Sequence, residues 1–120
     1  RFEFSTMAYG CAIGLTSAIE FLNHVGIESI FDHNQSLADA LISGLMDRGV
    51  EVTSPRSLAE RSAIVTAQFA GLDSSDVTER FKESDIRVAC RQDVVRFSPH
   101  LYNEMVDIEA ALSCVDAILA

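Results

Sequence analysis

Basic residues are scarce in this chain, and their scarcity excludes several classes of partner. The 120 residues include 9 lysines and arginines against 18 aspartates and glutamates, which gives a formal net charge of −9 and a sequence pI of about 4.6. Nucleic acids and acidic membrane surfaces attract proteins through basic patches. Apolar runs are also short, and none approaches the roughly 20 residues of a membrane-spanning helix. We therefore expect neither a nucleic-acid partner nor a membrane-embedded one.

Cysteines are few, and their pattern argues against a disulfide framework. Cys11, Cys90 and Cys114 are odd in number and far apart, which is typical of a reducing compartment, so we expect a cytoplasmic protein. The first residues show no signal-peptide pattern, and the abrupt opening at Arg1 suggests a piece of a larger protein.

Lysine and histidine are also too sparse for several kinds of active site. The single lysine, Lys82, lies among charged residues on the polar side of a predicted helix, which favours a plain surface charge over a catalytic amine. The three histidines, His24, His33 and His100, lack the helical pairing of zinc sites. The chain also has no Cys-x-x-Cys spacing. We expect no metal site.

Hydrophobic periodicity predicts an α+β domain. Helices are expected over residues 7–23, 28–48, 73–83 and from 104 to the end, with strands over 50–53, 62–69, 86–90 and 94–97. Ser5 or Thr6 is the expected cap of the first helix, while Gly26 and Gly49 should end the first two. The order ααββαββα indicates a small antiparallel or mixed four-stranded sheet covered by helices. We expect a single domain over residues 1–120.

Apolar residues at helical spacing identify the faces that should be buried. In the first helix these are Cys11, Leu15, Ala18 or Ile19 and Leu22; in the second, Ile30, Leu37, Leu41 and Leu45; in the last, Met105, Ile108, Leu112, Val115 and Leu119.

The stretch from Val94 to Asn103 carries the main functional hypothesis. Arg96 is the one charge in a short apolar strand that Pro99 should terminate, and Asn103 is a good N-cap for the helix that follows. Arginine can grip a planar carboxylate with two parallel hydrogen bonds. We interpret Arg96 as an anion clamp. Composition, taken alone, favours the alternative, in which Arg96 is paired with Asp93 or Asp107.

Cys90 lies six positions before Arg96 and could act as a nucleophile. A small, buried strand residue is the favoured interpretation of this cysteine.

The run Arg96-Phe97-Ser98-Pro99-His100-Leu101-Tyr102-Asn103, followed by Asp107-Ile108, resembles the C-terminal end of class V aminotransferases, which are fold type I pyridoxal-phosphate (PLP) enzymes. The opening Arg1-Phe2-Glu3-Phe4-Ser5-Thr6 is similar to the Arg-Phe-Glu-x-Gly-Thr segment that begins their C-terminal domain. Weaker similarity at residues 26–45, 61–65 and 86–91 extends the resemblance over the whole chain.

The resemblance implies a fold, a cofactor and two site residues. The fold would be the C-terminal small domain of fold type I PLP-dependent transferases, which closes over an amino-acid substrate held by a large, PLP-binding domain that this chain lacks. Arg96 would bind the substrate carboxylate, and Thr6 would contact the PLP phosphate of the neighbouring subunit in a homodimer, although Ser5 replaces the usual glycine. Without a lysine suited to a Schiff base, the chain alone should be inactive and should not bind PLP.

The branch of the family and one alternative class stay open. Cysteine desulfurases carry their reactive cysteine on a longer loop before the arginine motif, and the short Cys90–Arg96 hairpin leaves no room for that loop. The chain looks closer to the aminotransferase, epimerase or kynureninase-like branches, among which its residues do not choose. The alternative is a free-standing α+β module that binds small molecules or dimerises without catalysis; a protein-interaction domain with a salt-bridged Arg96 is the third.

Overall fold

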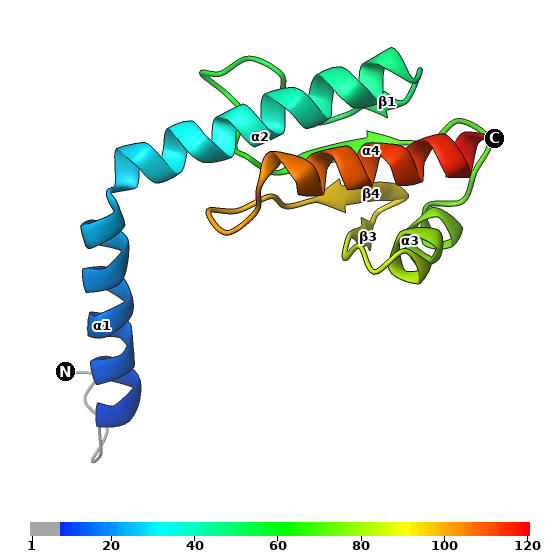
Figure 1. Ribbon diagram of the computed structural model, residues 1–120. Helices are drawn as coiled ribbons and strands as arrows, with labels where there is room; N and C mark the ends of the chain where they lie inside the picture. Colours follow the sequence, from blue (N-terminus) through cyan, green and yellow to red (C-terminus); the bar gives the residue numbers. More distant parts are fainter. Residues whose placement is uncertain (1–7) are drawn as a thin grey trace. The chain divides into compact units, whose positions relative to one another are not determined.

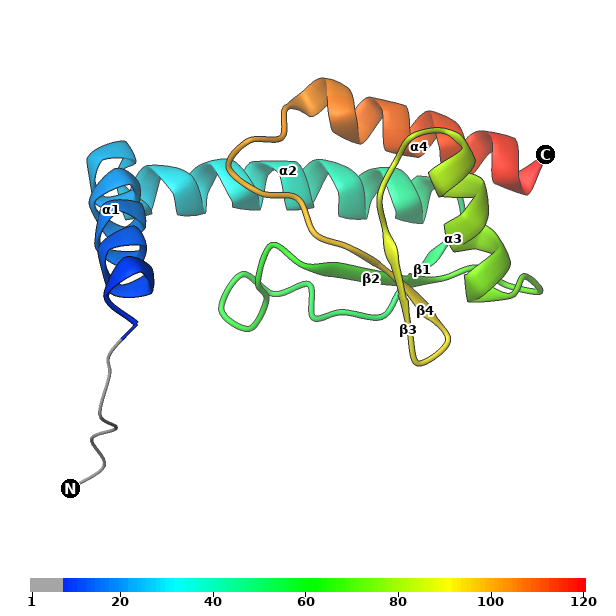
Figure 2. The same ribbon diagram turned by 90° about the horizontal axis from the view of Figure 1, so that it is seen from below.

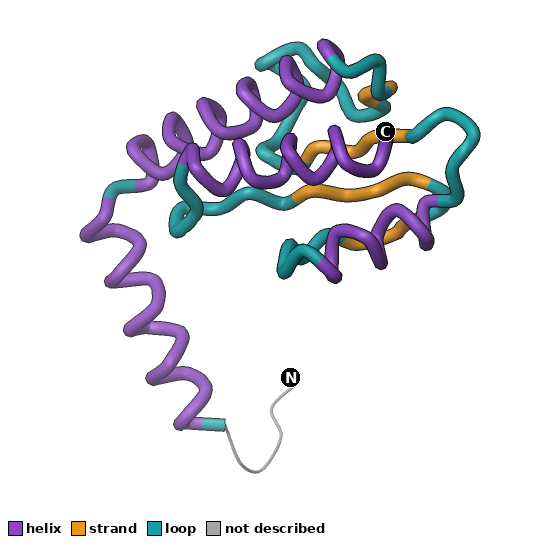
Figure 3. The backbone as a smooth tube through the Cα atoms, turned by 45° about the vertical axis from the view of Figure 1, so that its right-hand side comes forward, coloured by secondary structure: helices purple, strands orange, loops and turns teal. Residues whose placement is uncertain are grey.

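The computed structural model describes residues 8–120, which form four helices and four strands (Figures 1 and 3). Their order is α1 (Tyr9–Val25), α2 (Ile27–Asp47), β1 (Glu51–Val52), β2 (Val65–Gln68), α3 (Ser74–Glu83), β3 (Ala89–Arg91), β4 (Val94–Phe97) and α4 (Met105–Leu119). The chain divides into two compact units, Arg1–Asp32 and His33–Ala120. The single domain expected over residues 1–120 stays a prediction. None of the helices within residues 8–120 has the length and apolar content needed to cross a bilayer.

The four strands form one antiparallel sheet in the order β1-β2-β4-β3. In the central pair, Val65 lies opposite Phe97 and Ala67 opposite Val95, and all four side chains are buried. Side chains alternate between the two faces of a strand, so these four residues define the face of the sheet that faces the core. The predicted α+β class and the order ααββαββα are confirmed.

Helices α2, α3 and α4 supply the other half of the core (Figures 1 and 2). From α2, Leu37, Leu41 and Leu45 are at most 1% exposed. Phe81 of α3 packs edge-on against Phe97 of β4, with ring centroids 5.3 Å apart. The apolar stripe predicted for the second helix is therefore largely the stripe that is buried.

Two helices of the sheet-bearing unit end in the same hydrogen-bonded motif. After α2, Gly49 takes a φ of +74°, and the N–H of Val50 donates to the Leu45 carbonyl. After α3, Asp85 takes a φ of +58°, and the N–H of Ile86 donates to the Phe81 carbonyl. These are Schellman motifs, for which the left-handed residue is usually glycine. The end predicted at Gly49 is confirmed; the use of Asp85 in a motif is why β3 begins at Ala89 rather than at residue 86.

The first helix differs from its prediction in position and in burial. It runs from Tyr9 to Val25, two residues later than expected, and Ala8 precedes it without a side-chain cap. Ser5 and Thr6, the predicted caps, lie outside the described residues. None of the residues of α1 is buried in this structure, so its predicted apolar stripe has no core to face.

The last helix begins and packs differently from the prediction. Its N-cap is Glu104, not Asn103, because the Glu104 N–H donates to Asp107 Oδ2 at 3.0 Å. Met105 and Leu119, expected in the core, are exposed. The predicted Ile108 and Val115 are buried and Leu112 is partly buried, while Ala111, Cys114 and Ile118 are core positions that the prediction missed. The reason is that α4 packs against α3 as well as the sheet, which turns its buried side toward Cys114, a residue close to the backbone of α3.

Candidate functional site

Arg96 occupies the middle of β4, where neighbouring strands hold its backbone on both sides. Thr66 of β2 lies directly opposite on one side and Ala89 of β3 on the other. Because Val95 and Phe97 point into the core, Arg96 points to the opposite face of the sheet. Among residues 33–120, helices α2, α3 and α4 pack on the core face only, so this opposite face, which we call the open face, is bare of helices.

The guanidinium of Arg96 has unused hydrogen-bonding capacity. Its Nε atom is buried and has no hydrogen-bond partner among the described residues. A buried donor without a partner costs about 1–3 kcal/mol, and no residue of the described part offsets that cost for Arg96.

The two carboxylates considered as partners for Arg96, those of Asp93 and Asp107, do not pair with it in the described part of the chain. Asp107 accepts from the Glu104 N–H and from Asn103 Nδ2, both at 3.0 Å, and these hydrogen bonds lower the pKa of its carboxyl group. Asp93 lies in the β3–β4 turn, where its carbonyl accepts from Ser74 Oγ at 2.7 Å. Neither carboxylate forms an ion pair with Arg96 in the described part of the chain.

Asn103 holds the loop that leads from β4 to α4. Its Oδ1 accepts from the His100 N–H at 3.0 Å, its own N–H donates to the His100 carbonyl at 2.8 Å, and its Nδ2 donates to Asp107. Its carbonyl accepts from Nε2 of His33, on α2, at 2.9 Å, so that ring nitrogen carries a proton. Both the side chain and the backbone of Asn103 are thus bonded. The residue predicted as a helix cap instead fixes the whole loop after Arg96.

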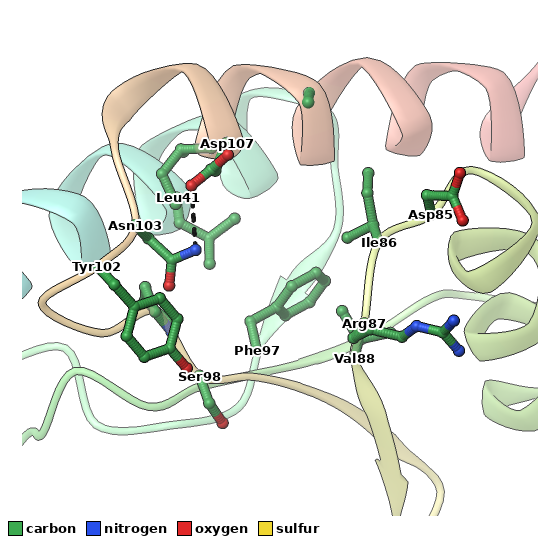
Figure 4. Close-up of a pocket in the computed structure, with 13 residues that line it drawn as sticks. Leu41, Asp85, Ile86, Arg87, Val88, Phe97, Ser98, Tyr102, Asn103 and Asp107 are labelled. Carbon is green, nitrogen blue, oxygen red and sulfur yellow. Dashed lines mark hydrogen bonds between the residues drawn. The ribbon is translucent and has the colours of Figure 1, made fainter.

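A hollow of about 440 Å³ lies on the core side of the sheet, where β4 ends (Figure 4). Phe97 lies at its centre in this view, with Tyr102 and Ser98 on one side and Ile86 on the other. Arg96 is not among the lining residues. Because the Asp107 carboxylate on its border is already doubly hydrogen-bonded, the hollow offers an apolar surface more than acid–base chemistry. We therefore place the candidate site on the open face, at Arg96.

The remaining sequence-derived candidates are not gathered around Arg96. Thr6, the predicted phosphate contact, lies outside the described residues. Lys82 is exposed on α3, with Nζ 2.6 Å from Glu79 Oε1. Cys90 lies directly opposite Val95, so it belongs to the core face rather than the open face. Residues 8–120 bring together no group of three histidine, cysteine, aspartate or glutamate side chains that could hold a metal.

The open face also carries charges that the sequence interpretation did not use. In β3, Arg91 lies on the same face as Ala89, opposite Val94. Arg87, two residues before β3, follows the same alternation in sequence but borders the hollow on the core side of the sheet. The signal was present in the sequence, since residues 87, 89 and 91 alternate with Ile86, Val88 and Cys90, but it became informative only once the register was known.

Comparisons with known proteins give consistent results over nearly the whole chain. The family model for aminotransferase class-V proteins matches residues 1–111. A probable cysteine desulfurase of Pyrococcus abyssi is 27% identical over 99% of this chain and 33% of its own length. The uncharacterized aminotransferase YcbU of Bacillus subtilis is 24% identical over 98% of this chain and 31% of its own length.

Solved structures show the same arrangement of elements. The apo cysteine desulfurase of Thermococcus onnurineus NA1 matches with a TM-score of 0.94 and 26% identity, over 98% of this chain and 33% of that one. The cysteine desulfurase CsdA of Escherichia coli matches with a TM-score of 0.88 and 25% identity, over 98% and 32%. This chain therefore spans about a third of the length of the relatives it matches.

Proposed function

Because the chain belongs to the aminotransferase class-V family of PLP-dependent enzymes, we propose that it is the C-terminal, substrate-closing part of a longer enzyme in which Arg96 binds the carboxylate of an amino-acid substrate. The observation that carries the proposal is the Arg96 guanidinium, which is held in the middle of a sheet, with a buried Nε that has no partner in residues 8–120. Arg96 thus lacks the internal partner that a purely structural arginine would have.

The described residues do not fit the cofactor-holding role. Lys82 is 52% exposed and paired with Glu79 on the surface of α3, where no enclosed site surrounds it. PLP supplies an electron sink for bond breaking at the substrate Cα when it is bound. In our proposal another part of a longer chain binds it, and the present 120 residues alone are inactive. Thr6 is proposed as a phosphate contact across a homodimer on the family pattern.

The contribution of Arg96 is binding and orientation. Its two-pronged guanidinium fits the two carboxylate oxygens, so the substrate is fixed in rotation as well as in position. Replacing the water around both charges by a direct contact strengthens the interaction, because the site then has a lower dielectric constant. The pairing of β4 with β2 on one side and with β3 on the other fixes the backbone at Arg96.

We propose an aminotransferase-like reaction in which Cys90 is not a sulfur acceptor. Gln92 and Asp93 both have positive φ and make a two-residue turn, so Cys90 is held within a tight hairpin. The alignment with the Pyrococcus abyssi protein runs over 132 positions, 12 more than the 120 residues here, so that desulfurase-like relative carries residues without a counterpart. The alignment with YcbU runs over 119 positions. This difference favours a branch without an inserted loop.

Kinetics of the longer enzyme test the proposal. Arg96→Ala should raise KM for the amino acid and lower kcat/KM by at least about 30-fold, since removing one member of a desolvated charge pair costs about 2–5 kcal/mol. Arg80→Ala, on α3, is the matched control and should change neither constant. Cys90→Ala should leave turnover intact. An unchanged KM in Arg96→Ala would refute the carboxylate contact.

A free-standing carboxylate-binding module is the second candidate, because the 120 residues already present Arg96 without help from another chain. Calorimetric titration of this chain with amino acids separates the two. Binding in the micromolar range would favour the module, whereas absence of measurable heat would favour the enzyme fragment.

A further inference from the structure

The open face places a second arginine beside Arg96. Ala89 lies directly opposite Arg96, and Arg91 is two residues further along β3 on the same face. We infer that Arg91 binds a second anionic group of the ligand, so that the substrate is a dicarboxylic amino acid. This inference rests on the proposed function of Arg96 and names the substrate class of that same site.

The register determines how the two guanidinium groups can share a ligand. Residues on adjacent strands that are offset by two positions have Cα atoms about 7–8 Å apart, within reach of long side chains. The pairs Arg91–Val94 and Ala89–Arg96 give Arg91 and Arg96 this diagonal relation. Ala89 and Val94 occupy the other diagonal of this four-residue cluster, and the small side chain of Ala89, next to both arginines, leaves space above the sheet. A short diacid can therefore lie above Ala89 and Val94 with one carboxylate at each arginine.

The charges of the open face favour an anion with more than one negative charge. Arg91 and Arg96 are like charges side by side, an arrangement that is unfavourable without a counter-charge. Neither forms an ion pair with another residue of the described part, although the chain carries 18 acidic residues. By contrast, Arg48 is paired with Asp116 and Arg61 with Asp39. The carboxylate carried by β1, Glu51, lies opposite Gln68 and thus beyond β2.

Arg91 is a better candidate for this role than Arg87. Arg91 belongs to β3 and pairs with Val94, so the sheet fixes the position of its backbone. Arg87 lies before the strand and borders the hollow on the core side of the sheet together with Asp85. The assignment is therefore made to one residue, and Arg87 is left out of the site.

A matched pair of ligands tests the inference without turnover. Glutarate and pentanoate have the same number of carbons and differ in one carboxylate. Titrated calorimetrically into the longer, PLP-loaded enzyme, glutarate should bind at least about 10-fold tighter than pentanoate, equivalent to about 1.4 kcal/mol. Arg91→Gln should reduce that ratio to about 2 or less. Arg80→Gln, which removes the same charge from α3, should preserve the full ratio.

The outcomes separate this inference from the proposed function. Equal binding of the two acids to the parent enzyme, with both lost in Arg96→Gln, would overturn the dicarboxylate assignment and leave the clamp standing. A preference for glutarate that survives in Arg91→Gln would also overturn the role of Arg91. Binding that is indifferent to Arg96→Gln would refute the clamp itself. Preference for glutarate that depends on both arginines supports both proposals.

Discussion

Replacing Arg61 with alanine should lower the free energy of unfolding of this chain by about 1–4 kcal/mol. The Arg61 side chain is only 6% exposed, and it joins the connection between β1 and β2 to helix α2. Its Nε donates to Oε1 of the buried Gln35 at 2.9 Å, and its Nη1 lies 2.7 Å from Asp39 Oδ1. The guanidinium therefore fixes the segment that leads into β2, the strand that supports Arg96.

The magnitude follows from what the truncation leaves behind. Gln35 would keep a buried acceptor without a partner, at a cost of about 1–3 kcal/mol. The ion pair with Asp39 adds no more than about 1 kcal/mol, because the Asp39 side chain is 63% exposed and screened by solvent. Replacing both Gln35 and Arg61 with apolar residues, as Leu and Met, should recover much of the loss, since no buried polar group then lacks a partner.

Urea unfolding followed by circular dichroism measures the effect. With a slope of about 2 kcal/mol per molar urea, the midpoint should fall by about 0.5–2 M. Arg56→Ala is the matched control, because Arg56 is an exposed arginine of the same connection whose side chain reaches only Met46 Sδ, at 3.6 Å; its effect should stay within about 0.5 kcal/mol. Equal midpoints for Arg61→Ala and the parent chain would refute the reasoning.

The stability of the chain in acid solution provides a second test of the Arg61–Asp39 pair. The hydrogen bond from Arg61 lowers the pKa of Asp39. A carboxyl whose pKa is lower in the folded state contributes stability above its unfolded pKa, and that contribution is lost as the pH falls through the folded value. The parent chain should lose this contribution below about pH 4, whereas Arg61→Ala should lack it at every pH.

Three further outcomes follow from other contacts. Asp85→Gly should raise stability by about 0.5–1 kcal/mol, because glycine takes the positive φ of the α3 terminus without strain, whereas Asp85→Ala should not. Asn103→Ala should lower the free energy of unfolding by about 1–2 kcal/mol. It should also speed hydrogen exchange at the His100 amide, which loses its acceptor. The hydrogen bond from Arg48 lowers the pKa of Asp116, so the stabilisation by this pair is present above about pH 4 and is lost in more acid solution; Asp116→Asn should flatten that fall in the urea midpoint.

Each of these has a result that contradicts it. Equal stability of Asp85→Gly and Asp85→Ala would mean that the backbone conformation is not strained. Unchanged exchange at the His100 amide would mean that the Asn103 contact is absent in solution. An Asp116→Asn chain with the acid profile of the parent would locate that dependence elsewhere, for example at Asp39 or Asp107, whose carboxyl pKa values are also lowered by hydrogen bonds.

Local patterns were sufficient for the elements and for one face of the sheet. The spacing of Leu37, Leu41 and Leu45 and the stop at Gly49 predicted α2, because both signals lie within a few residues of one another. The strand predicted over residues 62–69 contains β2, in which the buried Val65 and Ala67 alternate with the half-buried Thr66 and the exposed Gln68. Such signals depend on short-range geometry, which the chain determines before it packs.

Long-range contacts explain what local patterns missed. Asn103 is a good N-cap by residue type, but His33 of α2, 70 residues away in the sequence, holds its carbonyl in the loop, and the helix is capped one residue later, at Glu104. Arg61 lies between the strands predicted over residues 50–53 and 62–69, and its burial depends on Gln35 and Asp39 of α2, which are more than 20 residues away in the sequence. The candidate site divides in the same way. Resemblance and an embedded charge pointed to Arg96, whereas Arg91 needed the strand register.

Helix α1 has a practical consequence for work on this chain. Its 17 residues include one acidic residue, Glu20, one histidine, His24, and no lysine or arginine. The side chains of Ile13, Leu15 and Phe21 are each more than half exposed. A helix with several exposed large apolar side chains favours self-association as the protein concentration rises. Measurements on the sheet and its arginines should therefore be made on dilute samples. Sedimentation over a concentration series shows the concentration at which self-association begins.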